Sequence, residues 1–278
     1  MTVGSPSEVR IALLFPELLG TYGDGGNAAV LVSRLRWRSI PVDLSQVRVG
    51  DPVPESCDMY LLGGGEDGPQ ASAARELRAG PVLLRAVDRG AVILAVCAGF
   101  QILGHTFAGP GGPENGLGLL DVTTRRGPGP RFVGELVVDP HPDLNLPTLT
   151  GYENHACVTD LGSGVKALGQ VTAGHGNGGR MPDSSVAPPS AAADIGAVRT
   201  EGAWSGRVLG TYLHGPVLAR NPALADLMLA WVVGPLDAIE DCDIDRLRAE
   251  RIAAGLSTGA DARLRWRRRR SAAGSEPR

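Results

Sequence analysis

A cysteine stands where the most apolar segment of the chain stops. The run Ala91 to Val96 (AVILAV) predicts a buried strand, and Cys97 follows it directly. The small residues Ala98 and Gly99 come next, before a helix predicted over residues 100–107. Such a turn exposes the thiol above the sheet, and the N–H groups of the helix start favour the thiolate, which is the nucleophilic form. A buried core cysteine is the alternative interpretation, and these residues alone leave both open.

Three consecutive glycines, Gly63 to Gly65, follow another apolar run, Asp58 to Leu62. Consecutive glycines permit positive φ and leave backbone N–H groups unobstructed, as an oxyanion hole requires. Glycine turns after strands are common, so this signal is weak on its own. A phosphate-binding loop is not indicated, because the Lys-Ser/Thr pair of a P-loop does not follow.

His214, within Leu209 to Pro216 (LGTYLHGP), best suits the role of a general base. It ends a predicted strand and precedes Gly-Pro, which places it at the sheet edge where α/β enzymes hold ligands. His105 is expected about two helical turns beyond the cysteine, and that spacing carries it away from the thiol. The remaining histidines suit loops or a pocket wall better than a base: His141, His155 and His175.

The elements around these residues alternate. Strands are predicted at Val9 to Phe15, Ile40 to Leu44, Asp58 to Leu62 and Ala91 to Val96. Helices are predicted after the first of them, from Asn27 to Trp37, and after the third, from about Pro69 to Arg89. This order predicts an α/β fold with a parallel sheet and helices on both faces. Shorter β-like runs follow between Leu117 and about Thr172. We interpret residues 1–235 as one domain and residues 236–278 as a charged helical segment with an arginine-rich tail.

Composition narrows the class of protein. The 278 residues are 43% hydrophobic and 21% charged, which is ordinary for a globular protein. No run approaches eighteen apolar residues, and the polar N-terminus lacks a signal pattern, so we expect a cytoplasmic protein without a membrane span. A net charge of −3 gives no indication of nucleic-acid binding. Four cysteines are widely spaced and form no CxxC pair, so in a reducing compartment we interpret them as thiols and not as a disulfide framework or a zinc site: Cys57, Cys97, Cys157 and Cys242.

The charge of the chain is uneven near its C-terminus. Arginines gather between Arg263 and Arg270. Such a cluster attracts an anionic membrane or the acidic face of a partner, and a solvated terminus is the other interpretation.

In chain order, these motifs resemble the class I (triad-type) glutamine amidotransferases, in the branch that includes cobyric acid synthase. Longer stretches are similar to the glutaminase subunits of bacterial lipid II isoglutaminyl synthases: Tyr22 to Asn27 (YGDGGN), Leu62 to Asp67 (LGGGED) with Gln70, Gly151 to His155 (GYENH) and Gly210 to Pro216. The resemblance runs from about Val9 to Val233. It implies the flavodoxin-like three-layer fold of that class, with a central, mostly parallel sheet.

The resemblance also implies roles for residues. Cys97, activated by His214, would attack the side-chain amide of L-glutamine, and the oxyanion would be held by backbone N–H groups of Gly64, Gly65 and Ala98. Substrate binding falls to Arg131, which best matches the family's glutamine-binding arginine, and to Gln101 by its position. A solvated strand-end arginine is the alternative for Arg131. The roles of three further residues stay open: Glu153, Asn154 and His155.

One position departs from the pattern of the class. Most class I glutaminases read His-x-Glu, and the glutamate orients the histidine, whereas Pro216 stands there in this chain. No carboxylate of this chain is therefore evident as the third member of the triad. The resemblance implies that an aspartate of the synthase subunit completes it, and we expect weak glutaminase activity from the isolated chain.

The resemblance implies a two-subunit enzyme that amidates the D-glutamate of lipid II to D-isoglutamine during peptidoglycan synthesis. The partner would be a Mur-ligase-like (MurT-type) synthase subunit that holds ATP, Mg²⁺ and the acceptor, and no metal or cofactor is expected in this chain. A lipid-linked acceptor would bring the complex near the membrane surface. The alternatives are a component of a cobyrinate or cobyric-acid-type synthase, a non-catalytic regulatory module and a stand-alone cysteine hydrolase.

Overall fold

The apolar runs of the sequence form the inner strands of a six-stranded sheet in the computed structural model, which describes residues 7–178 and 199–273. The strand order is β13-β14-β4-β3-β1-β2, and every neighbouring pair is parallel except β13 with β14. The strands are β1 (Val9–Leu14), β2 (Val42–Val47), β3 (Met59–Leu62), β4 (Val92–Val96), β13 (Ala203–Ser205) and β14 (Val208–Thr211).

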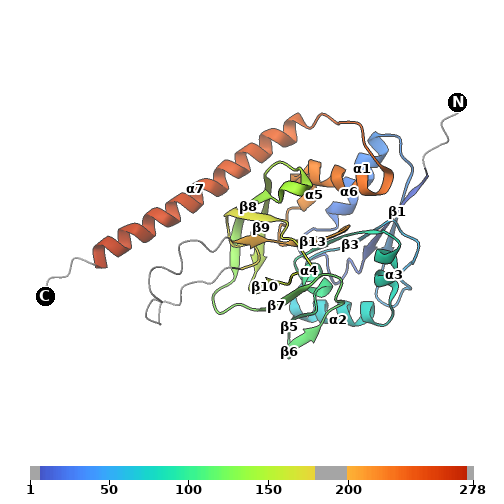
Figure 1. Cartoon of the computed structure of the whole chain (residues 1–278), viewed down its shortest axis with the longest axis horizontal. Coiled ribbons are helices and arrows are strands. Elements are labelled where there is room, and N and C mark those ends of the chain that lie inside the picture. The colour runs from blue at the N-terminus through green and yellow to red at the C-terminus, as the bar shows by residue number, and fades with distance from the viewer. Residues whose placement is uncertain (1–6, 179–198, 274–278) are drawn as a thin grey trace.

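Helices cover both faces of this sheet (Figure 1). On one side pack α1 (Gly26–Trp37), α5 (Val217–Arg220) and α6 (Pro222–Val233). On the other lie α2 (Asp67–Arg78), α3 (Val82–Asp88) and α4 (Ala98–Leu103). The crossovers from β1 to β2 and from β3 to β4 run in opposite directions along the sheet, so right-handed connections put their helices on opposite faces. The predicted three-layer α/β arrangement is confirmed.

Two smaller four-stranded sheets form the region after the elbow helix. One has the order β10-β7-β5-β6, with β5 (Thr106–Gly109), β6 (Gly112–Asn115), β7 (Val122–Arg126) and β10 (Cys157–Leu161). The other has the order β12-β11-β8-β9, with β8 (Phe132–Pro140), β9 (Leu149–His155), β11 (Gly169–Ala173) and β12 (Thr200–Glu201). A single 3₁₀ turn, η1 (Pro142–Leu144), joins β8 to β9.

The elbow helix is shorter than the sequence predicted. It ends at Leu103, because Gly104 adopts an extended conformation with ψ of −174°, and residues 106–109 then form β5. His105 therefore lies in a loop, where its Nε2 is 3.1 Å from Oδ1 of Asp121. The expectation that His105 stands on a helix was wrong, although the consequence that the chain carries it away from the thiol is unchanged.

A long helix, α7 (Cys242–Ala273), extends away from the three sheets (Figure 1). Its first half packs on β8 and β9, and Nη2 of Arg248 donates to the carbonyl of Thr148 at 2.7 Å. The arginine cluster lies on its far half. None of the helices in the described ranges is both long and apolar enough to cross a membrane. The division of the chain at residue 235 remains a prediction.

Candidate active site

Cys97 occupies a strained turn between β4 and α4. Its φ of 50° and ψ of −104° lie in a region that residues other than glycine rarely adopt. The backbone holds this turn, because the N–H of Cys97 donates to the carbonyl of Thr211 at 2.8 Å. A Cβ on Gly99 would lie 2.7 Å from Cβ of Leu62, so the small residue expected after the cysteine is required by packing.

His214 reaches the same edge from the neighbouring strand. Thr211 of β14 is paired in parallel with Val96 of β4, and His214 follows three residues later. Its ring is fully buried between Tyr22, in edge contact at 4.9 Å, and Tyr152, stacked at 5.2 Å. Its backbone is fixed by the bridge to Tyr152, with N–H to O distances of 2.8 and 3.2 Å. The two predicted catalytic residues are thus brought to one edge of the sheet.

A carboxylate of this same chain lies against the histidine. Nδ1 of His214 is 3.1 Å from Oδ2 and 3.3 Å from Oδ1 of Asp24, and both side chains are fully buried. Asp24 belongs to the loop between β1 and α1 and is 190 positions away along the chain. The pattern around Pro216 did not make this carboxylate evident, and the supply of a carboxylate by a partner subunit stays a prediction.

A signal for Asp24 was present in the sequence. It sits in the Tyr22 to Asn27 motif, near the end of the loop that leads from the first strand of the parallel sheet to α1. The carboxyl ends of parallel strands share one edge, and Cys97 and His214 end strands of the same sheet. The His-x-Glu pattern concerns only the position two residues beyond the histidine, so it does not include Asp24.

The thiol and the imidazole are not hydrogen-bonded to each other in this structure. Nε2 of His214 is buried and has no hydrogen-bond partner among the described residues. Cys97 is 4% exposed, and burial, followed by the charge of Asp24, raises the pKa of its thiol to about 12. The N–H of Ala98 and the charge of Arg131 oppose that rise without cancelling it. The structure thus holds a protonated thiol in a closed site.

A small recess opens beside Cys97. Its volume is about 20 Å³, which is room for about one water molecule. Its wall includes residues that the sequence singled out: Gly65, Cys97, Ala98, Gln101, Arg131 and His155. The amide of Gln101 is engaged internally, because its oxygen accepts from Gln70 at 2.8 Å and its nitrogen donates to Tyr212 at 3.2 Å.

The glycine run is shaped by what packs against it. A Cβ on Gly64 would lie 2.8 Å from Cε1 of His214, and one on Gly65 would lie 2.5 Å from the carbonyl oxygen of Leu18. The N–H of Gly64 donates to Oδ2 of Asp24 at 2.9 Å. In this closed state the Gly64 donor is therefore occupied, while the N–H of Ala98 faces the sulfur of Cys97.

Arg131 stands in the recess wall and is oriented from two sides. Its Nε donates to Oδ1 of Asn154, and its Nη2 donates to the carbonyl of Asn154 at 3.1 Å and to the hydroxyl of Tyr22 at 2.9 Å. The Tyr22 hydroxyl in turn donates to Glu66 at 2.7 Å. A guanidinium held beside the thiol suits the α-carboxylate of an amino acid.

The residues around Asn154 have different surroundings. The buried carboxylate of Glu153 accepts from the N–H of His175 and from that of Gly176, each at 2.9 Å. Burial opposes its ionisation, but His155, His175 and these N–H groups face it and lower its pKa to about 2. Glu153 thus ties down the 174–178 turn, whereas His155 stacks on Tyr212 at 3.9 Å and faces the recess.

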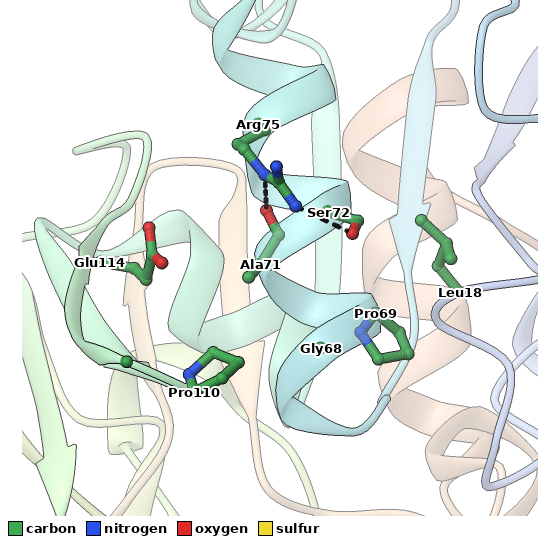
Figure 2. A pocket seen from close by; sticks show the side chains of 9 residues that line it. Leu18, Gly68, Pro69, Ala71, Ser72, Arg75, Pro110 and Glu114 are labelled. Atoms are coloured by element: carbon green, nitrogen blue, oxygen red, sulfur yellow. Dashed lines mark hydrogen bonds between the residues drawn. The ribbon is translucent and has the colours of Figure 1, made fainter.

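A larger hollow of about 650 Å³ lies elsewhere, between α2 and the β5–β6 hairpin. Figure 2 shows Leu18 and Pro69 on one side of it and Pro110 and Glu114 on the other. Arg75 is folded back onto its own helix, where it bonds the carbonyl of Ala71 and the hydroxyl of Ser72. Neither a cysteine nor a histidine lines this hollow, whereas Cys97 and His155 line the small recess.

Comparison with known proteins agrees with this geometry. The model of the CobB/CobQ-like glutamine amidotransferase domain matches residues 10–222. The "Lipid II isoglutaminyl synthase (glutamine-hydrolyzing) subunit GatD" of Staphylococcus aureus is 32% identical over 227 residues, covering 80% of this chain and 83% of that protein. The protein of the same name from Streptococcus pneumoniae is 33% identical over 79% of this chain and 78% of its own length.

Two further matches complete the comparison. A cobyric acid synthase of Cereibacter sphaeroides is 32% identical over 61% of this chain but only 31% of its own length. A crystal structure of a glutamine amidotransferase has a TM-score of 0.50 at 19% identity and covers 80% of this chain and 98% of its own. That structural likeness concerns the fold.

Proposed function

This chain belongs to the family of CobB/CobQ-like glutamine amidotransferase domains, and from that premise we propose that it is the glutamine-hydrolysing subunit of a lipid II isoglutaminyl synthase. The observation that carries the chemistry is the delivery of Cys97 and His214 to one sheet edge by neighbouring parallel strands. Two proteins named as GatD subunits are similar to this chain over about four fifths of its length, and this similarity supports lipid II as the molecule that receives the ammonia.

In the first half of the reaction, Nε2 of His214 takes the proton of the Cys97 thiol. The thiolate attacks the side-chain amide carbon of L-glutamine, and the carbonyl oxygen becomes an oxyanion beside backbone N–H groups such as that of Ala98. The imidazolium then gives its proton to the amide nitrogen as the C–N bond breaks, which releases ammonia and leaves a thioester.

In the second half, the imidazole takes a proton from water as the oxygen attacks the thioester carbon. The C–S bond breaks, glutamate leaves, and the sulfur recovers its proton from the imidazolium. Arg131 would hold the substrate α-carboxylate throughout, and Gln101 would contribute to the pocket wall. The second oxyanion donor would come from Gly65, because the N–H of Gly64 is engaged by Asp24.

The synthetic half of the reaction belongs to a partner in this proposal. A Mur-ligase-like subunit of the MurT type would bind ATP, Mg²⁺ and the acceptor, and ammonia would amidate the D-glutamate of lipid II in the cytoplasm. The lipid-linked acceptor would keep the complex close to the membrane surface. The arginines on the far half of α7 are compatible with that location.

The closed site gives the partner a further role. L-Glutamine does not fit a recess of about 20 Å³, and the thiol and imidazole share no hydrogen bond within the described residues. We expect partner docking to open the recess and bring Nε2 to the sulfur. The isolated chain would then hydrolyse glutamine slowly, for a reason other than a missing carboxylate.

A cobyric-acid-type synthase is the second candidate. The same chemistry at Cys97 would serve it, and a cobyric acid synthase matches 61% of this chain. However, the match covers only 31% of that relative, which therefore has a long region without a counterpart here. A non-catalytic regulatory module is disfavoured by the intact pair of Cys97 and His214.

The test compares the chain alone with the chain co-purified with the Mur-ligase-like partner. Glutamate release is measured in both samples, and amidation of a lipid II analogue is followed with ATP and Mg²⁺. The complex should amidate the analogue with glutamine, and the Cys97→Ala complex should do so only with ammonium chloride. A wild-type complex that amidates with ammonium but not with glutamine would refute the proposal, and amidation of a cobyrinate instead would favour the second candidate.

A further inference from the structure

We propose that Asp24 is the positioning residue of His214, supplied from the loop between β1 and α1 in place of the carboxylate that Pro216 lacks. This inference rests on the proposed glutaminase activity. In the described part of the chain, Asp24 pairs with His214, whose Nδ1 lies 3.1 Å from Oδ2. Both carboxylate oxygens lie within 3.3 Å of Nδ1.

The contact determines which ring nitrogen carries the proton. An ionised carboxylate only accepts hydrogen bonds, so the nitrogen that faces it is the N–H of the neutral imidazole. Nδ1 of His214 faces Asp24, and Nε2 is left with a lone pair. Nε2 is buried and has no partner among the described residues, so its lone pair is available to take a proton from the thiol.

The surroundings of Asp24 are built to hold the carboxylate in this place. Oδ2 also accepts from the N–H of Gly64 at 2.9 Å, which fixes the carboxylate from the side opposite the loop. Gly26 packs against the ring of Pro216 so closely that a Cβ there would clash, so the loop is pressed onto the strand end that carries His214. The two tyrosines described above fix the plane of the imidazole between them.

Stability alone would not place an acid here. Among the residues that the structure describes, no lysine or arginine forms an ion pair with Asp24. A buried carboxylate without such a partner is costly to desolvate, and a neutral side chain could accept from Gly64 at lower cost. A positioning role gives the acid a purpose, because it stabilises the imidazolium formed when His214 takes the thiol proton. A purely structural role would require only an acceptor for Gly64.

The experiment uses the complex with the partner and compares Asp24→Asn with Asp121→Asn. Asp121 forms the matched aspartate–histidine pair with His105 at 3.1 Å, and it lies on the surface away from Cys97. In Asp24→Asn the amide oxygen still accepts from Gly64, and the amide N–H₂ faces Nδ1, so the ring must carry its proton on Nε2. We expect kcat for glutamine hydrolysis to fall by about 10²–10⁴ with KM within about threefold, as for a wrong tautomer.

Two further readouts separate positioning from structure. Asp24→Glu keeps the charge and should recover part of kcat. The pH profile of kcat should differ between Asp24→Asn and the wild type, because the substitution removes the charge that faces Nδ1. Tyr22, Tyr152 and Cys97 are the other ionisable groups around the ring. A kcat within threefold of wild type in Asp24→Asn, with an unchanged pH profile, would overturn the proposal.

The ring ¹⁵N signals of His214 decide the matter independently of activity. We expect the Nδ1–H tautomer in the wild-type protein and the Nε2–H tautomer in Asp24→Asn. If the ¹⁵N signals show the Nε2–H tautomer in the wild-type protein, the proposal is refuted, even if Asp24→Asn fails to fold. If the wild-type complex does not hydrolyse glutamine, the proposed function fails, while the Nδ1–H tautomer would still support the role of Asp24 in setting His214.

Discussion

Thr211 accepts a hydrogen bond from the backbone N–H of Cys97 at 2.8 Å, and this contact fixes the strand of the nucleophile against the strand of the base. Because β4 and β14 run in parallel, the residues that follow them leave the sheet at the same edge. Backbone register therefore brings the proposed nucleophile and base to one edge, although their side chains share no hydrogen bond in this structure. The following predictions test separate parts of this arrangement.

The buried thiol should resist alkylation. With a pKa of about 12, Cys97 should present roughly a thousandfold less thiolate at neutral pH than a thiol of pKa 9.0. Iodoacetamide labelling of the isolated chain, followed by mass spectrometry of the peptides, should modify the exposed Cys242 first. Labelling of Cys97 should accelerate when the partner is added. Equal labelling of both cysteines in the isolated chain would contradict the closed site.

Gly64→Ala should displace the ring of His214 although His214 itself is unchanged. The new methyl group would lie 2.8 Å from Cε1 of His214 and 3.1 Å from Oδ2 of Asp24. We expect a loss of stability of about 1–3 kcal/mol and at least a tenfold fall in kcat, measured by thermal unfolding and glutamate release. Gly68→Ala is the matched control, since its Cβ meets nothing within 4 Å. If both variants behave alike, crowding at His214 is not the cause.

Arg131→Lys should weaken glutamine binding more than turnover. Lysine cannot reproduce the fork that contacts Asn154 and Tyr22, so a cation would remain without its orientation. KM for glutamine should rise by roughly one to two orders of magnitude, the equivalent of about 1.4–2.8 kcal/mol, while kcat changes less. Arg125→Lys, at a surface ion pair with Asp160, should leave both constants unchanged. An unchanged KM in Arg131→Lys would remove Arg131 from the substrate site.

Glu201 should make stability depend on pH. Burial raises its pKa to about 7, against hydrogen bonds from Tyr212 and Thr211 that favour the charged form. The pKa of Glu201 in the folded protein lies above the unfolded value of 4.5. The contribution of Glu201 to the free energy of unfolding is therefore fully present below pH 4.5 and is lost as pH rises through about 7.

Glu201→Gln should therefore stabilise the protein by about 3 kcal/mol at pH 8 and by much less at pH 4.5, in chemical denaturation. Glu76→Gln, on the exposed face of α2, should change the free energy of unfolding by less than about 0.5 kcal/mol at either pH. A gain that is the same at both pH values would mean that Glu201 does not titrate in this range.

Site residues that are marked by their own neighbours in the sequence could be predicted. Cys97 and His214 each stand at the end of an apolar run, and the strand pattern alone predicts a shared edge. Asp24 has no such signal in its immediate neighbours, because its role depends on a contact 190 positions away. Its loop could have been recognised as a part of the same edge, but the distance of one carboxylate from one ring nitrogen is a tertiary property.

The glycines show a second limit of the sequence. The freedom of glycine at positive φ is what predicts an oxyanion hole at Gly63 to Gly65. In the structure the lack of a Cβ at Gly64 and Gly65 is needed because His214 and the chain at Leu18 come close. The sequence shows that these positions have no side chain. Only the folded structure shows which atoms lie where a Cβ would be. The closed recess has the same origin, since burial is a sum over many contacts.

The burial of Cys97 has a consequence for anyone who seeks an inhibitor. An electrophilic glutamine mimic can react only with molecules in which the recess has opened, so its apparent affinity for the isolated chain is reduced by the fraction that is open. A screen on this subunit alone would undervalue good compounds. A screen on the assembled enzyme, with long incubation, would rank them by their fit to the competent form.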